Sequence, residues 1–370
     1  MELHAQRPDS RSRRNHLLKR HQSFLFPRPE IPFPYRPGSP AAFPKKTGQS
    51  LLTRWRNVSV KKRHDPVRIY SLRKDDIRPL EPRDIPLIFL AHNSIQFIPS
   101  FLAHYRKLGI TRFLCVDDQS TDGTREKLLA ENDVDIFGSD IRYRQANGGN
   151  LWREALVRIY GTKRWYMNVD CDEYFIYDEC ETRTLPELIV RLEAKGVLHC
   201  PAPMIDCYPS ANLKSAVFNG SSGTMPWEIA NTFDRSGYRL SRTNSAMSMM
   251  GGPRDRLLDD PQHYDELMKY PLLYVEYPIA FTISIHKPWP FHRNFSPIFG
   301  SLLHFKFFSE TEEFVKKAIE GGQYFKGSRA YKTMLEAITA GKLDNLNSSV
   351  SVRFENSKQL AELGFFKSVF

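Results

Sequence analysis

The stretch Trp165-Tyr-Met-Asn-Val-Asp170-Cys-Asp172-Glu173-Tyr-Phe175 decides what kind of fold this chain adopts. An apolar segment gives way there to three closely spaced carboxylates. In extended backbone, residues two apart project to the same side of the strand. The side chains of Asp170 and Asp172 are therefore expected on the same side. Such a pair repels unless a cation lies between the two groups, and Mn²⁺ or Mg²⁺ with oxygen ligands meets that need. The alternative is a solvated acidic turn or a helix cap.

Short apolar segments alternate with segments of helical spacing along residues 85–196. The segments predicted as strands are 85–91, 112–116, 134–137 and 165–169, and helices are predicted over 95–109, from about 124, over 150–160 and over 185–196. This alternation predicts an α/β fold with a mostly parallel central sheet that is flanked by helices. Ligands of such sheets bind beyond the carboxyl ends of the strands.

Two of those strand ends are acidic. Asp117-Asp118-Gln-Ser-Thr-Asp-Gly-Thr124 follows the second predicted strand, and the motif at Asp170 follows the fourth. The chain has no GxGxxG and no GxxxxGK[ST] loop, the phosphate-binding sequences of dinucleotide-dependent dehydrogenases and P-loop nucleotidases. Both of those classes therefore lose support.

The net charge of +11 over 370 residues is concentrated at the N-terminus. Residues 1–80 hold 19 of the 53 basic residues and only 6 of the 42 acidic ones, and they are rich in proline. We predict a basic arm, extended and partly disordered, because proline disrupts helices and central strands. A neutral body behind such an arm makes nucleic acid an unlikely partner. The arm is either a solvated terminus or a contact for anionic lipid or an acidic partner.

Aromatic residues in this arm, Phe24, Phe26 and Phe33 with Leu25, could insert into a bilayer surface or dock on the protein itself. The longest apolar run, 85–91, is far shorter than the roughly 20 residues of a membrane-spanning helix. Five cysteines without a CxxC pair favour a reducing compartment. We therefore expect a cytoplasmic protein, with peripheral contact at the inner face of the membrane as an option for the arm.

The motifs at 117–124 and 169–175 together resemble those of glycosyltransferase family 2, in particular its bacterial branch without membrane helices. The segments 101–109, 251–256 and 302–307 are also similar to that branch, so the resemblance covers about residues 84–308. It implies a GT-A fold and metal-dependent transfer of a sugar from a nucleotide-diphospho-sugar. The acceptor would be a glycan or a lipid-linked molecule in cell-envelope polysaccharide or lipopolysaccharide synthesis, and the transfer would invert the anomeric centre.

The resemblance also implies roles for individual residues. The candidate nucleotide-binding residues are Asn93, Asp117, Asp118, Asp170, Arg254, Arg256 and Lys306, and the candidate metal ligands are Asp170, Asp172 and His304. One departure is Asn93-Ser94, where the branch often has Asn-Glu, and we expect Ser94 to cap the next helix. Arg254 and Arg256 are expected in a glycine-preceded loop that could approach a diphosphate. They could equally be surface arginines, and His304 could be a hydrogen-bonded core residue.

An inverting transfer requires a general base near the acceptor hydroxyl. Asp206, after the apolar stretch 197–205, is the first candidate, and it could equally be a turn residue. Asp255 is the second candidate, followed by Glu228.

The predicted organisation is an arm over 1–80, a GT-A domain over 81–308 and a C-terminal helical extension over 309–370 that packs on the same domain. A nucleotidyltransferase of similar fold is an alternative, but such enzymes usually carry a glycine-rich basic loop where this chain has His92-Asn-Ser-Ile95. A non-catalytic protein that binds membrane or nucleic acid through its arm is the third reading.

Overall fold

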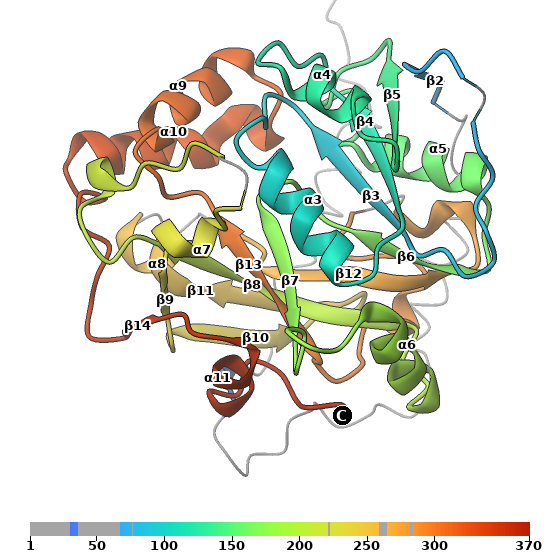
Figure 1. Cartoon of the computed structure of the whole chain (residues 1–370). Coiled ribbons are helices and arrows are strands. Elements are labelled where there is room, and N and C mark those ends of the chain that lie inside the picture. Colours follow the sequence, from blue (N-terminus) through green and yellow to red (C-terminus); the bar gives the residue numbers. More distant parts are fainter. Residues whose placement is uncertain (1–29, 36–66, 76, 221–222, 259–264, 282–283) are drawn as a thin grey trace, which may run out of the picture.

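A computed structural model of the protein describes residues 30–35, 67–75, 77–220, 223–258, 265–281 and 284–370, without the side chains of 325–327. The chain forms a mixed α/β fold in which a large central sheet is flanked by helices (Figure 1). The fold class predicted from the sequence is therefore confirmed.

The first half of the sheet is parallel. Its elements are β3 (Pro86–Ala91), α3 (Ile98–Lys107), β4 (Arg112–Asp117), α4 (Thr124–Leu129), β5 (Val134–Ser139), α5 (Asn150–Tyr160) and β6 (Arg164–Asn168). The strands lie in the order β6-β3-β4-β5, each parallel to its neighbour. The predicted strands are confirmed to within two residues, but α3 begins three residues later than expected. Ser94 therefore does not cap it.

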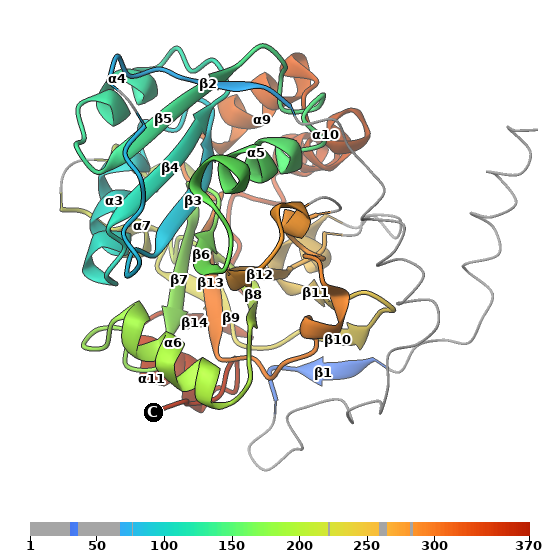
Figure 2. The same cartoon turned by 90° about the vertical axis from the view of Figure 1, so that its right-hand side faces the viewer.

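Alternating side chains of the parallel strands contact helices on opposite faces. Leu87 and Phe89 of β3 pack in one apolar cluster with Phe101 of α3. Ile88, between them, packs in a second cluster with Trp152 of α5. Figure 2 shows α3 and α5 on the two sides of β3. Because successive side chains of a strand point to opposite faces, helices pack on both faces of the sheet. The fold therefore has three layers, with the sheet between helices.

The second half of the sheet mixes directions. Its elements are β7 (Glu173–Tyr177), α6 (Leu185–Ala194), β8 (His199–Tyr208), α7 (Pro226–Ile229), β9 (Thr232–Asp234), β10 (Tyr238–Arg242), β11 (Met247–Gly251), α8 (Gly252–Leu257), β12 (Met268–Val275) and β13 (Gly300–Phe305). Strand β12 runs antiparallel to both β6 and β8, and so joins the two halves. Strand β13 is parallel to β8 and antiparallel to β7.

Two short strands of the N-terminal region pair with the body. Strand β1 (Ile31–Phe33) pairs with β10, and β2 (Ile69–Ser71) pairs with β5, both antiparallel. Phe33 is 2% exposed, and its ring contacts those of Tyr238 and Phe365 edge-on. Of the two fates considered for Phe33, docking on the protein itself is the one observed. Phe24, Leu25 and Phe26 lie outside the described residues.

The C-terminal region contributes α9 (Thr311–Gly321), α10 (Phe325–Thr339), β14 (Ser351–Arg353) and α11 (Ser357–Glu362). Helices α9 and α10 pack above the end of β13, where Val315 and Tyr331 share an apolar cluster with Phe307. Among the described residues, every helix is too short or too polar to cross a membrane.

Candidate active site

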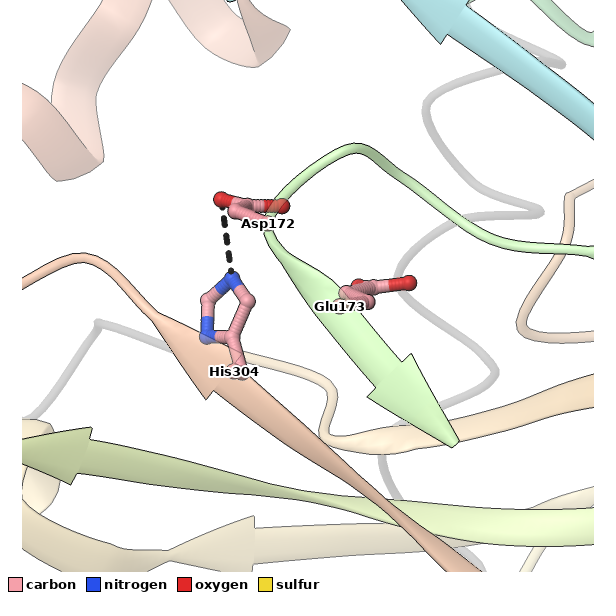
Figure 3. Close-up of side chains that lie close together, drawn as sticks. All are labelled: Asp172, Glu173 and His304. Atoms are coloured by element: carbon pink, nitrogen blue, oxygen red, sulfur yellow. Dashed lines mark ion pairs between the residues drawn. The ribbon is translucent and has the colours of Figure 1, made fainter. Parts of the chain in front are cut away.

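Three ionisable side chains lie side by side where β7, β13 and β8 meet. In the strand register His304 pairs with Glu173 on one side and with Asp206 on the other. All three are almost fully buried. Asp172 precedes β7, so its carboxylate faces the His304 ring from the strand end (Figure 3).

His304 is held between two carboxylates. Its Nδ1 lies 2.6 Å from Oδ1 of Asp206, and its Nε2 lies 3.4 Å from Oδ2 of Asp172. Burial disfavours the charged ring, but Asp172 and Asp206 outweigh this effect and raise the pKa of His304 above its usual value. Since Asp206 accepts the Nδ1 hydrogen, the Nε2 atom is the one directed to Asp172.

Asp206 is itself fixed from the other side by Arg254. The guanidinium donates to both carboxylate oxygens, from Nε at 2.7 Å and from Nη2 at 3.1 Å, and also pairs with Asp265. Burial opposes ionisation, but Arg254 and His304 lower the pKa of Asp206 to about 2. A general base must reach the acceptor hydroxyl, and a buried carboxylate with these partners suits positioning His304 better than abstracting a proton.

Asp170 has a different set of partners from Asp172. Its oxygens accept from Nη2 of Arg153 at 2.8 Å and from Nζ of Lys269 at 2.7 Å. Burial opposes ionisation of Asp170, but these two cations outweigh it and lower the pKa. The chain turns at 171–172 instead of staying extended. Asp170 and Asp172 therefore have separate partners, Arg153 and Lys269 for Asp170 and His304 for Asp172.

Lys269 also contacts Glu173, and it neutralises two carboxylates at once. The ammonium is 4% exposed, and although burial opposes its charge, Asp170 and Glu173 raise the pKa of Lys269. Burial raises the pKa of Glu173, and Lys269 offsets only part of that effect. These ion pairs join Lys269 of β12 to Asp170 and to Glu173 at the start of β7.

The donor atoms of Asp172, Glu173 and His304 lie within 4.8 Å of one another, a spacing that suits a metal ion. Asp172 is 26% exposed in its side chain, whereas Glu173 is occupied by Lys269. A histidine that binds a metal usually donates its other ring hydrogen to a carboxylate, as His304 does to Asp206. Asp172 and His304 are therefore the two residues of this group that could hold a divalent metal ion.

The two acidic residues at the end of β4 and just after it, Asp117 and Asp118, each pair with an arginine. Asp117 is paired with Arg125 at 2.6 Å, and Asp118 is paired with Arg142 at 2.8 Å. The side-chain oxygen of Asn93, which is exposed, accepts the backbone N–H of Thr121. The Asn93 contact joins the loops after β3 and β4, whereas Asp118 joins the loop after β4 to Arg142 in the segment after β5.

The three consecutive charged residues of α8 point in different directions, because successive helical residues are rotated by about 100°. Arg254 faces the site. Asp255 pairs with Arg239 at the surface, and both side chains are 41% exposed. Arg256 turns to Asp234 at 2.9 Å. The segment was expected to be a loop, and its helical form separates these side chains.

Glu228 and Lys306, the two remaining candidates, differ in their relation to the site. Glu228 accepts the backbone N–H of Met225 and closes the first turn of α7, a structural task. Lys306 follows β13, two residues beyond His304. The pKa of Asp172 lies below its usual value: burial opposes this shift, and the charges of His304 and then Lys306 favour it. Lys306 thus belongs to the site.

Sequence reasoning missed Arg153, Lys269 and Asp265. Lys269 interrupts the apolar strand Met268–Val275, and Arg153 lies on the buried face of α5, where it donates to Asn168 at 2.7 Å. A charged residue in an apolar strand or on an apolar helix face was the available signal, since such groups are rarely buried without a partner.

No known family profile and no curated protein sequence matches this chain. Solved structures with some similarity include HddC from Yersinia pseudotuberculosis, with a TM-score of 0.30, 10% identity, and coverage of 59% of this chain and 90% of that one. The bifunctional glycosyltransferase WbbM in its apo form has a TM-score of 0.22 at 13% identity, and the match covers 36% of this chain and 24% of WbbM.

A third similar structure is the inositol-1-phosphate CTP transferase from T. maritima, with a TM-score of 0.25, 8% identity, and coverage of 77% of this chain and 98% of that one. These scores are too low to assign an activity, so the function is argued from the site.

Proposed function

We propose that this protein is a metal-dependent glycosyltransferase that uses a nucleotide-diphospho-sugar. One observation carries the proposal: His304 stands between Asp172 and Asp206 at the strand ends, with Lys306 beside it. This arrangement offers ligands for a cation and a free positive charge next to it. Phosphoryl groups of a donor need both.

Each residue of this group has a distinct task in the proposal. Asp172 and His304 would hold Mn²⁺ or Mg²⁺, and Asp206 with Arg254 fixes the ring so that Nε2 is directed to Asp172. A divalent cation bound there would neutralise charge on the departing diphosphate. Asp170, held by Arg153 and Lys269, faces the ribose or shares the cation.

The loops after β3 and β4, which carry Asn93 and Asp118, are proposed to receive the nucleoside. The acceptor is proposed to be a glycan or a lipid-linked molecule, in keeping with the family that the motifs resemble. That part rests on the resemblance alone, since a fold supports many substrates. Inversion at the anomeric carbon has the same basis.

The test is a panel of nucleotide sugars assayed for hydrolysis and for transfer with Mn²⁺ or Mg²⁺. We expect turnover that requires the metal, and we expect Asp172→Asn to abolish metal-dependent nucleotide binding with the thermal unfolding temperature unchanged. A parallel assay with nucleoside triphosphates and sugar phosphates follows pyrophosphate release. Activity in that assay alone would identify a nucleotidyltransferase and refute the proposal.

A further inference from the structure

Three tyrosines from two distant segments meet beside the site. Tyr143 lies in the loop between β5 and α5, Tyr324 immediately precedes α10, and Tyr331 lies on α10. The ring centroids of Tyr143 and Tyr324 are 6.0 Å apart, and those of Tyr324 and Tyr331 are 4.7 Å apart. The cluster therefore connects the proposed nucleotide side of the molecule with the C-terminal helices.

The cluster adjoins the charged group of the candidate active site. Nζ of Lys306 lies 5.5 Å from the centroid of the Tyr331 ring. Burial raises the pKa of Tyr331, and the negative charge of Asp172 raises it further. Among the described residues, no carboxylate pairs with Lys306, so its charge is available to a ligand.

The three phenol groups have no hydrogen-bond partner in the part of the chain that the structure describes. Tyr331 is only 9% exposed, yet none of the three hydroxyls has a hydrogen bond to another described residue. None of the three hydroxyl oxygens is among the fully buried atoms without a partner, so each is accessible to a ligand. Burial also raises the pKa of Tyr143 and Tyr324, so all three phenols stay neutral and can donate hydrogen.

The chemistry of the cluster indicates what it binds. The rings of Tyr324 and Tyr331 meet at 63° and those of Tyr143 and Tyr324 at 53°, so they form no common flat surface on which a base or sugar could stack. The cluster instead presents three hydroxyl donors and one ammonium. Oxygen atoms that carry negative charge satisfy such a set best.

We propose that Tyr143, Tyr324, Tyr331 and Lys306 form a subsite for the diphosphate oxygens of the donor. The inference rests on the proposed function and adds residues to it that no motif indicated. Lys306 supplies the charge and the tyrosines supply directional hydrogen bonds. Segment 140–149 and α10 together would then enclose the group that leaves with the nucleotide.

Titration calorimetry on the full chain tests this, with inorganic pyrophosphate, UDP and GDP as probes, each with and without Mn²⁺. The variants are the triple Tyr143→Phe/Tyr324→Phe/Tyr331→Phe and Lys306→Met. Because hydrogen bonds to charged groups are strong, we expect the diphosphate affinity to fall by at least about tenfold in each. In the triple tyrosine variant, affinity for Mn²⁺ alone and the thermal unfolding temperature should stay unchanged.

Tyr70→Phe is the matched control, since Tyr70 lies on β2, is 48% exposed and is far from Asp172 in sequence and sheet order. Its diphosphate affinity should equal that of the wild type.

If the triple variant and Lys306→Met bind the probes as well as the wild type while Asp172→Asn does not, the subsite is refuted and the proposed function stands. If the triple variant keeps diphosphate affinity but loses only transfer to an acceptor, the cluster serves the acceptor and the inference is wrong. If the wild type binds none of the probes, the proposed function fails and the subsite with it.

Discussion

The two halves of the sheet satisfy their charges in different ways. In the parallel half, Asp117 pairs with Arg125 eight residues away, and Asp118 with Arg142 twenty-four residues away. In the mixed half, Asp206 pairs with His304 ninety-eight residues away. Local sequence therefore determines the first half, whereas the second depends on how distant strands align. The candidate active site lies where the two halves meet.

Asp170 shows this junction most directly. It follows the last strand of the parallel half, and it is held by Arg153 from that half and by Lys269 from the mixed half. Because β12 runs antiparallel to β6, Lys269 reaches the end of the strand at which Asp170 stands. The strongest way to break the junction is to remove that ammonium.

Lys269→Met should produce the largest loss of stability. Glu173 is 1% exposed and would keep a buried carboxylate without its cation. Removing one partner of a buried ion pair costs about 3–5 kcal/mol. We expect a loss in this range in the free energy of unfolding, measured by urea denaturation. The double variant Lys269→Met/Glu173→Gln should recover part of it, and a loss below about 1 kcal/mol in the single variant would show that Lys269 is not the counter-ion.

The strands of the N-terminal region extend the comparison, because β2 joins the parallel half and β1 the mixed half. Phe33→Ala removes a ring packed between Tyr238 and Phe365 and should cost about 3 kcal/mol. Tyr70→Ala on β2 removes a side chain that is 48% exposed and should cost less than about 1 kcal/mol. Thermal and urea unfolding measure both. Equal losses would mean that β1 contributes no more than β2 to the fold.

The sequence predicted the parallel half well because its signals are local. Apolar runs that end in Asp117 and Asp170 define strands and their tips, and the helices between them follow the 3.6-residue period. The sequence also indicated His304, as a lone histidine in an apolar strand. The sequence could not indicate the directions of the Arg254, Asp255 and Arg256 side chains, because these depend on whether 252–257 is a loop or a helix. The role of Lys269 depends on the pairing of β12 with β6, which no short motif encodes.

His104 links the halves on the face opposite α5, and its charge gives a smaller, pH-dependent effect. Its Nε2 hydrogen-bonds with the backbone oxygen of Phe175 in β7. Burial lowers the pKa of His104 to about 4 from the usual 6.5. Between these values the unfolded chain binds a proton that the folded protein excludes, so stability is complete above pH 6.5 and falls as the pH decreases toward 4.

We therefore expect the free energy of unfolding of the wild type to fall, between pH 7.5 and 5.5, by about 1.4 kcal/mol more than that of His104→Gln. Urea denaturation at the two pH values measures the difference, and the other buried histidines contribute equally to both proteins. Parallel pH profiles of the two proteins would show that His104 titrates normally in the folded state.

Asp255→Asn should have the smallest effect of all, although the sequence made Asp255 a candidate base. Its pair with Arg239 is exposed, and exposed pairs contribute about 0–1 kcal/mol. We expect nucleotide-sugar turnover within about twofold of the wild type. Asp206→Asn, the matched change on the buried side of α8, should instead release His304 and weaken Mn²⁺ binding. A collapse of turnover in Asp255→Asn with unchanged Mn²⁺ binding would make Asp255 the base, and would require α8 to present a different face to the acceptor than it does here.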